Sequence, residues 1–391
     1  MPKPTVKITR TIRSEQVLNA FVEVVRKNLP LDLRNTRITA EDILYVLAYA
    51  NVHRLSIESA CLELQNAPSG NRLREVLVES LPDRSGLQKR LNRIFRQQIH
   101  PSLWKCKRDF NLAIDLTLIP YHGQPYEDQK EIVRSAPKSG TTHFHAYATV
   151  SIVRDNRRYV VALRFIEYGE EMAEIVRWLL KRLKSLHFRI RRVFLDKAFC
   201  AKSVFKVLEQ HKVSYVTPIP VRGKSGGVRT LFQGKSRLTT YTFNSPKHGQ
   251  YTVQAVVVQR YSKGRYGRHK RKWFAYAVSG LPTGYLPAQV FELYRQRFGI
   301  ESSYRQMNQV RARTSTRNPV IRLLLIGLAF VLFNLYIALR QHLTSALKKP
   351  VQSSKRFWLS LRRVAFLLSR AIERLWGTTE VFQHQPCCEL S

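Results

Sequence analysis

The architecture of this chain follows from residues 110–120, which read FNLAIDLTLIP. The run is almost entirely apolar and ends in a proline, so it predicts a buried β-strand. A single carboxylate, Asp115, stands in its middle. Burying an unpaired carboxylate costs free energy. We therefore expect Asp115 to bind a metal ion or a cation, although a strand-edge residue without function is an alternative.

Strands and helices alternate after this run in the order that predicts an α/β fold. Two strands are expected near residues 142–153 and 158–166, joined by the turn signal Asp155-Asn156. The next elements are a helix near 170–186, a strand over 192–196, a helix near 199–211 and a strand over 213–217. The order β-β-β-α-β-α-β indicates three antiparallel strands followed by βαβ crossovers.

A second carboxylate, Asp196, ends the fourth of these strands. The carboxyl edge of an α/β sheet is where functional groups gather. The alternative is that Asp196 only caps the following helix.

The run YRQRFGIE at residues 294–301 carries a third acid. If the run is helical, Tyr294, Arg297 and Glu301 stand at i, i+3 and i+7 and share one face. A phenol, a guanidinium and a carboxylate on one face suit a phosphate together with a metal ion. The alternative is an amphipathic helix with a solvated face. With Asp115 and Asp196, Glu301 would complete a set of carboxylates that can converge on two divalent ions.

The charge of the chain favours a polyanionic partner. There are 66 Lys and Arg residues against 27 Asp and Glu, a net charge of +39, and each neutralised phosphate releases counterions. The 391 residues, 44% of them hydrophobic, predict two or three units with a sizeable core. Membrane-surface or ribosomal proteins share such a charge, but this length and hydrophobic content fit a basic enzyme better.

Cysteine usage predicts a reducing cytoplasm. The five cysteines are scattered without a CxxC pair, so they form neither a disulfide framework nor a zinc site. The N-terminus lacks the apolar core of a signal peptide. Residues 320–339 are apolar enough to imitate a membrane span. Arg322 and Asn334 interrupt that run, so we expect a buried packing helix and no membrane partner.

Residues 1–105 are expected to be entirely helical. Helices are predicted over 14–30, after Thr39, after Ser56 and over 72–81, with Asn71 as a possible cap of the last. A break at Pro68-Ser69-Gly70 precedes that helix, which begins with Arg72 and Arg74. This arrangement is typical of a helix-turn-helix that binds DNA, and an ordinary helical hairpin fits it equally well.

Short alternating strands replace helices between residues 222 and 285, and a helix is expected again over 288–307. Within this β-rich part lies the densest basic cluster of the chain, which includes Arg268, Lys270, Arg271 and Lys272. Basic residues interleaved with aromatic ones suit a DNA backbone, although a solvated hairpin tip is the alternative.

Together these motifs resemble the DDE transposases of bacterial and archaeal insertion sequences. Within them the chain is similar to the cut-and-paste group whose last motif is Y-(2)-R-(3)-E-(6)-K. Residues 114–121 match the first motif, residues 194–199 the second, and Tyr294, Arg297 and Glu301 the third. The resemblance covers about residues 109–340. One departure is Asn308, which stands where the motif has its lysine.

The resemblance implies a ribonuclease H-like mixed sheet flanked by helices, with a β-rich insertion and an all-helical N-terminal domain. We expect a helical DNA-binding domain over 1–105, a first part of the catalytic core over 106–221, a basic insertion over 222–285, a second part of the core over 286–345 and a C-terminal helical tail over 346–391.

The resemblance also implies an activity. Asp115, Asp196 and Glu301 would hold two Mg²⁺ ions, for which Mn²⁺ could substitute, and catalyse DNA cleavage at the ends of an element and strand transfer into target DNA. Tyr294 and Arg297 would grip phosphates beside the cleaved bond. The partners would be terminal inverted repeats and target DNA, with a homodimer in the active complex and a nucleoid-associated, cytoplasmic location.

Two alternatives stay open: a non-catalytic DNA-binding protein derived from a transposase, and a ribonuclease H-like nuclease without strand transfer. The phosphate contact of the missing lysine would pass to Arg305 or Arg311.

Overall fold

The computed structural model describes residues 11–34, 36–104, 109–154, 158–245, 249–263, 269–344 and 359–380. The side chains at 245, 262–263, 269–270, 298, 300–301 and 344 lie outside that description. The chain divides into two compact units, residues 1–98 with 305–391 and residues 99–304. Each unit is described by itself below.

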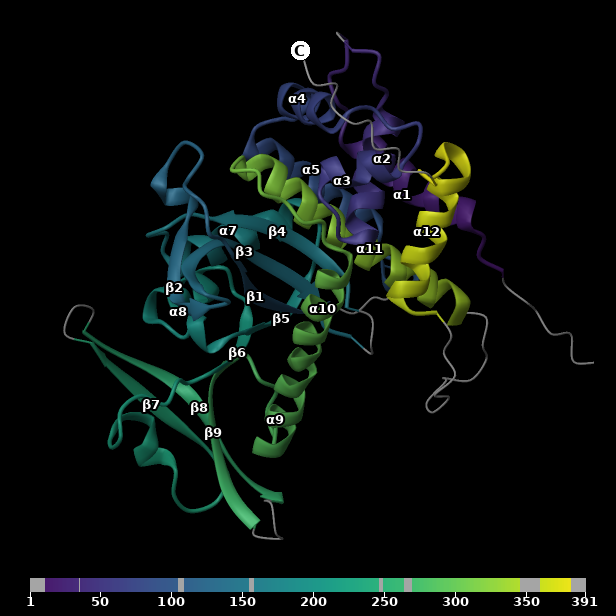
Figure 1. Ribbon diagram of the computed structural model, residues 1–391. Helices are drawn as coiled ribbons and strands as arrows, with labels where there is room; N and C mark the ends of the chain where they lie inside the picture. The colour runs from purple at the N-terminus through teal and green to yellow at the C-terminus, as the bar shows by residue number, and fades with distance from the viewer. Residues whose placement is uncertain are drawn as a thin grey trace, which may run out of the picture. The chain divides into compact units, whose positions relative to one another are not determined.

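The first unit is helical (Figure 1). Its helices are α1 (Ser14–Asn28), α2 (Ala40–His53), α3 (Ile57–Glu63), α4 (Gly70–Ser80), α5 (Arg84–Gln97), α11 (Pro319–Thr344) and α12 (Leu361–Trp376). Thr39 caps α2 and Ser56 caps α3, as predicted. The prediction that Asn71 caps α4 is wrong. Ser69 is the cap, because its hydroxyl accepts the Arg72 amide, while Asn71 lies inside the helix and accepts from Arg74.

Helix α11 contains the apolar run that imitates a membrane span. Of the helices described, it is the one long and apolar enough to cross a bilayer, with a mean hydropathy of 2.4 over Pro319–Leu343. In the most apolar window of that span, 89% of the residues are buried inside the protein. Gly327 lets α5 approach closely, because a Cβ there would lie 2.5 Å from Cδ1 of Leu91. The apolar surface of α11 is thus used for packing within the helical unit.

The second unit is built on one mixed sheet of nine described strands. They are β1 (Phe110–Pro120), β2 (Val133–Lys138), β3 (Thr141–Ile152), β4 (Val160–Ile166), β5 (Ile190–Leu195), β6 (Ser214–Pro218), β7 (Arg237–Ser245), β8 (Gly249–Lys263) and β9 (His269–Ser279). The order is β2-β3-β1-β5-β6-β9-β8-β7, and β4 also pairs with β3. β1, β5 and β6 are parallel neighbours and the other pairs are antiparallel. The predicted α/β fold is confirmed.

Two details of the sheet differ from the expectation. β2 was not predicted, because its sequence VRSAPK is mostly exposed and shows no apolar alternation. It pairs with β3 across Ser139 and Gly140, both at positive φ. The predicted turn at Asp155-Asn156 lies outside the described residues.

The strands of the basic insertion continue the core sheet. β9 pairs with β6 from Tyr215↔Ser279 to Pro218↔Tyr276, and β8 pairs with β9 along its length. Figure 1 shows β7, β8 and β9 as a long arm of this sheet. The three strands are longer than the sequence indicated, and they reach residue 263 on β8 and residue 269 on β9.

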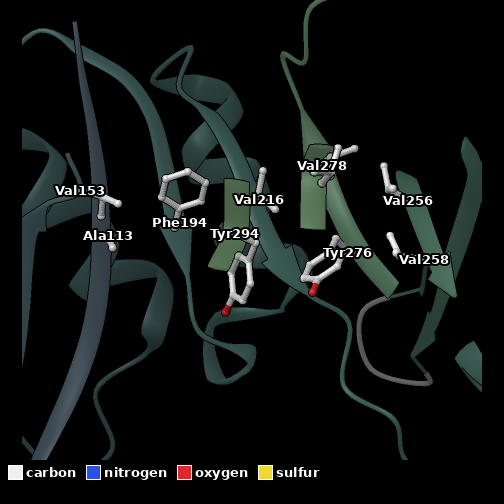
Figure 2. Close-up of a cluster of buried hydrophobic side chains, with 10 residues drawn as sticks. Ala113, Val153, Phe194, Val216, Val256, Val258, Tyr276, Val278 and Tyr294 are labelled. Atoms are coloured by element: carbon white, nitrogen blue, oxygen red, sulfur yellow. The ribbon is translucent and has the colours of Figure 1, made fainter. Parts of the chain in front are cut away.

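Helices cover both faces of the sheet (Figure 1). On one face α7 (Met172–Ser185) contacts β4, and α8 (Lys202–Gln210) packs Phe205 on Tyr215 of β6 with ring centroids 5.1 Å apart. On the other face α9 (Pro287–Arg295) inserts Val290 and Tyr294 into a buried apolar cluster. Figure 2 shows this cluster from Ala113 on β1 to Val258 on β8.

Gly280, directly after β9, should not tolerate a side chain. Its φ is +62°, and a Cβ there would lie 2.0 Å from Oγ of Ser214. We expect Gly280→Ala to lower the free energy of unfolding by about 2–5 kcal/mol, the sum of left-handed strain and overpacking. Chemical denaturation measures the loss.

Gly284→Ala is the matched control. Gly284 has a φ of +83° but no atom within 4 Å of the added Cβ, so only the strain of about 1–2 kcal/mol applies. Equal losses in the two variants would contradict the packing argument at Gly280.

Candidate active site

Asp115 and Asp196 lie side by side at the carboxyl end of β5. The parallel pairing joins Ile114 to Leu195, so the next residue on each chain is an aspartate. Strand residues two apart share a face. Asp115 therefore points to the side of Ala113, and Asp196 to the side of Phe194, which is the side that α9 covers. The sequence predicted both acids, and the fold brings them together.

Each aspartate is held by local hydrogen bonds. The Leu116 amide donates to Oδ1 of Asp115 at 2.9 Å, and Asp115 is only 8% exposed. The Thr217 hydroxyl on β6 donates to the Asp196 carbonyl at 3.2 Å. The Asp196 side chain keeps about a third of its surface exposed, at 35%.

Arg297 joins the two acids. Its Nη2 lies 2.9 Å from Oδ1 of Asp115, and its Nη1 lies 3.7 Å from Oδ1 of Asp196. The Arg297 side chain is 6% exposed. Nη1 also donates to the Tyr294 hydroxyl at 3.3 Å, and that hydroxyl donates to the Leu195 carbonyl at 3.1 Å. One guanidinium thus bridges the first two acids of the predicted set.

The spacing of Tyr294 and Arg297 matches the spacing along β5. Phe194 packs edge-to-face on the Tyr294 ring with centroids 6.4 Å apart, and Asp196, two residues later, meets Arg297, three residues later. Two strand residues advance roughly 6.6 Å. From Tyr294 to Arg297 the chain passes from α9 into the 3₁₀ turn Gln296–Phe298, so it advances roughly 5 Å. The apolar contact and the ion pair are therefore in register.

Electrostatics keeps the bridge charged and the phenol neutral. Burial lowers the pKa of Arg297, but Asp115, Tyr294 and Asp196 together outweigh it, so the pKa of Arg297 is raised. Burial raises the pKa of Tyr294, and Arg297 opposes that shift only in part. Tyr294 therefore stays protonated and keeps its hydrogen bond to Leu195.

Thr149 and Tyr304 belong to the same site, and the sequence analysis missed both. Thr149 on β3 is the direct cross-strand partner of Asp115. Its hydroxyl makes a short hydrogen bond with the Tyr304 hydroxyl, and burial raises the pKa of Tyr304 well above its usual value. A threonine in an apolar strand and a tyrosine on an amphipathic helix carry no local signal. Only the periodicity that puts Tyr304 one turn after Glu301 could have indicated it.

The third predicted acid, Glu301, lies on a helix that follows α9. Glu301 belongs to α10 (Gly299–Met307), and its side chain lies outside the described part. The single helix expected over 288–307 is wrong, because the 3₁₀ turn Gln296–Phe298 separates α9 from α10. The turn tightens the backbone at the point where Arg297 reaches the acids.

The two aspartates fit a bound cation. They already face one positive charge, and carboxylate oxygens are ligands that Mg²⁺ and Mn²⁺ prefer. Among the side chains that the structure describes, no group of three His, Cys, Asp or Glu gathers to hold a metal. The described donors are therefore Asp115 and Asp196.

The residues predicted to bind DNA lie in several places. On α4, Arg72 pairs with Glu75 at 3.1 Å and Arg74 with Glu58 at 2.7 Å, both near the surface. On β9, Arg271 and Lys272 are exposed, and Arg271 lies over the Tyr261 ring. Arg268 lies outside the described residues, as does the side chain of Lys270.

Position 308 lies just beyond the helix that carries Glu301. α10 stops at Met307, and Asn308–Val310 form a 3₁₀ turn. The following chain is drawn onto α2, where the Ala312 amide donates to the Asn51 side chain at 3.3 Å. Asn308 therefore lies in this turn and not on the helix of Glu301. Arg305 is exposed at the end of α10, and Arg311 is half-buried in extended backbone.

Comparison with known proteins relates the chain to a protein family and to a solved structure. A family model described as "Transposase DDE domain" matches residues 111–335, which is more than half of the chain. Among solved structures, the chain is similar to piggyBac transposase in a synaptic complex with hairpin DNA. The identity is 15%, the TM-score is 0.54, and the match covers 95% of this chain and 83% of that chain. None of the curated proteins compared matches the chain.

The matched residues include both aspartates that meet at Arg297 and the whole run from Tyr294 to Glu301. At 15% identity the solved structure supports the fold alone, and it supports the mixed sheet flanked by helices. The extent of the family match supports more, and on that ground this chain belongs to the DDE-domain transposases.

Proposed function

We propose that this protein is the transposase of a bacterial or archaeal insertion sequence of the cut-and-paste type. It would cut phosphodiester bonds at the ends of the element and join the freed 3′ ends to target DNA. The observation that carries the proposal is that Asp115 and Asp196, which follow one another on neighbouring parallel strands, both form an ion pair with the Arg297 guanidinium. The family match supports it.

Divalent ions are generally required in this family, and we propose Mg²⁺, with Mn²⁺ as a substitute. Asp115 and Asp196 would hold the metal from β1 and β5, and Glu301 would join them from α10. The bound ions would activate the attacking oxygen and stabilise the leaving one. Tyr294 would orient Arg297 through the 3.3 Å contact, and Arg297 would contact a phosphate beside the cleaved bond.

DNA is the proposed partner. The net charge of +39 supports it, and so does the DNA-bound state of the similar piggyBac transposase. We assign terminal-repeat binding to the helical domain over residues 1–105 and contacts with flanking DNA to the insertion over 222–285. Pairing of two element ends would require a homodimer. The free thiols of Cys61 and Cys200 are compatible with a cytoplasmic, nucleoid-associated protein.

Cleavage of the element's own ends tests the proposal. The DNA that flanks the gene is searched for short inverted repeats and a target duplication, and labelled duplexes with those repeats are incubated with the protein and Mg²⁺. We expect end-specific cuts and joined products, and denaturing gels show whether excised ends are hairpins. Binding without cuts would favour the non-catalytic alternative, and cuts without joining would favour a nuclease.

Arg271 and Lys272 on the arm should add to DNA affinity without reading sequence. Replacing both with glutamine should weaken binding to all duplexes and reduce the slope of log K against log salt by about 1.8, roughly 0.9 for each phosphate that is no longer neutralised. Gel-shift titrations at several salt concentrations measure the slope. Lys181→Gln with Lys184→Gln on α7, which packs away from the arm strands, is the charge-matched control. If the two double variants show the same slope of log K against log salt, Arg271 and Lys272 lie in a solvated hairpin tip that does not contact DNA.

A further inference from the structure

We propose that Arg297 is an internal competitor for the metal site. It neutralises Asp115 and Asp196 while no divalent ion is bound, and it leaves them when an ion arrives, which frees its guanidinium for a phosphate. The proposal rests on the proposed function in one respect, namely that these two aspartates take up a divalent ion.

The position of Arg297 is that of a substitute cation. Its two terminal nitrogens face the two acids separately, at 2.9 Å from Asp115 and 3.7 Å from Asp196. Two carboxylates at one partly buried site repel each other unless a positive charge lies between them. Arg297 forms an ion pair with each of them. The guanidinium therefore supplies neutralisation of the kind that a metal would supply.

The hydrogen bonding of the Arg297 guanidinium is incomplete. Its Nε is buried and has no hydrogen-bond partner among the described residues. The approach to Asp196, at 3.7 Å, is longer than a hydrogen bond. An unmet buried donor costs free energy, so this arrangement holds the guanidinium less firmly than a fully paired site would. The side chain is adequate for neutralising the acids but can be displaced.

The backbone beneath Arg297 provides a place for the movement. Residues Gln296–Phe298 form a 3₁₀ turn between two α-helices. Such a turn in the middle of a helical segment often marks a hinge. A guanidinium released there would lie next to the metal-bound acids, and its planar fork suits a phosphate with two parallel hydrogen bonds. Metal binding and phosphate binding would then support each other.

The test measures Mn²⁺ binding to the full-length, metal-free protein by calorimetry and electron paramagnetic resonance. Arg297→Gln removes the competing charge, so we expect the Kd for Mn²⁺ to fall at least about tenfold. Without metal, the same variant leaves two acids facing each other, and its melting temperature should fall by roughly 4 °C or more. Saturating Mn²⁺ should close most of that gap. An unchanged or higher Kd would overturn the proposal.

A coupling measurement tests the second half of the proposal. In the wild-type protein a short DNA duplex should tighten Mn²⁺ binding, and by reciprocity Mn²⁺ should tighten DNA binding by the same factor. In Arg297→Gln this coupling should become smaller, because only the contact between the metal and the DNA oxygens would remain. Coupling of undiminished size in the variant would mean that the released guanidinium is not the phosphate ligand.

Control variants separate the possible failures. Arg164→Gln removes another arginine of the same unit that is ion-paired, with Glu170, and mostly buried, so it should change stability but not the Kd for Mn²⁺. If Arg297→Gln does not fold, Arg297→Lys keeps the charge without the fork, and an intermediate Kd is expected; an unchanged Kd would count against the proposal. Asp115→Asn should abolish Mn²⁺ binding. If Asp115→Asn still binds Mn²⁺, the metal site of the proposed function is itself wrong. If only Arg297→Gln fails to change the Kd for Mn²⁺, the proposed function stands and this inference is wrong.

Discussion

Asp115→Asn should abolish DNA cleavage and strand transfer while DNA affinity stays within about twofold of the wild-type value, because affinity comes from Lys and Arg. The amide keeps the shape of the carboxylate but loses the charge that binds a metal. We expect a rate loss of at least about a thousandfold, the scale of removing a strong electrostatic group from an active site. Asp196→Asn should behave in the same way. Single-turnover cleavage of terminal-repeat duplexes and gel shifts provide the two readouts.

Asp109→Asn is the matched control on the same segment. Asp109 precedes β1 and pairs at the surface with Arg189 at 3.2 Å, so its loss should leave cleavage within about twofold, in line with the small worth of exposed ion pairs. Arg297 still faces Asp196 in the Asp115 variant, and circular dichroism checks that the fold is kept. Magnesium-dependent cleavage in Asp115→Asn would remove this residue from the catalytic set.

Arg297→Ala should reduce cleavage by about a hundredfold or more, the scale of losing a group that positions the reacting phosphate. If Arg297 is also the internal competitor, the same variant binds Mn²⁺ more tightly, so activity and metal affinity would change in opposite directions. A residue that only supports the fold would lower both. Arg297→Lys should recover part of the rate, because it keeps the charge but not the bidentate fork.

Asn308→Lys is the companion variant. It restores the lysine of the family motif at an exposed position of a 3₁₀ turn. We expect cleavage to be unchanged and end binding to be equal or mildly stronger, since a cation is added and no buried side chain is removed. A clear loss of activity in Asn308→Lys would show that the chain after α10 meets DNA differently from the family pattern.

Local sequence signals predicted the strands that carry the acids. The apolar run around Asp115 and the strand before Asp196 are short, buried and bounded by recognisable breaks, so the sequence located β1 and β5 well. β2 was missed because it is an exposed strand, fixed by pairing with β3 and not by its own composition. The sequence also did not predict that the strands of the insertion belong to the core sheet, because the pairing of β6 with β9 joins residues about sixty positions apart.

Sequence spacing showed which side chains share a face but not which partners they meet. Arg297 was predicted to face a phosphate, and in the structure it pairs with Asp115. Tertiary packing selects Asp115 as the partner of Arg297. The contact of Tyr294 with Phe194 positions the α9–α10 segment along β5, next to the acids. Thr149 and Tyr304 entered the site by the same route, through β3 pairing and α10 packing.

The pairing of β6 with β9 makes the insertion a rigid extension of the core sheet, so its length sets a fixed distance. Backbone hydrogen bonds run without interruption from β5, which ends one residue before Asp196, through β6 and β9 to the arm. A strand rises roughly 3.4 Å per residue, and B-DNA rises about 3.4 Å per base pair along each strand. If DNA is held at Arg271 and Lys272 and runs along the arm, the residues between these two and β6 set the number of base pairs between the held phosphates and the acids. Lengthening β8 and β9 by two residues each would move the held phosphates by about two base pairs and leave the acids where they are.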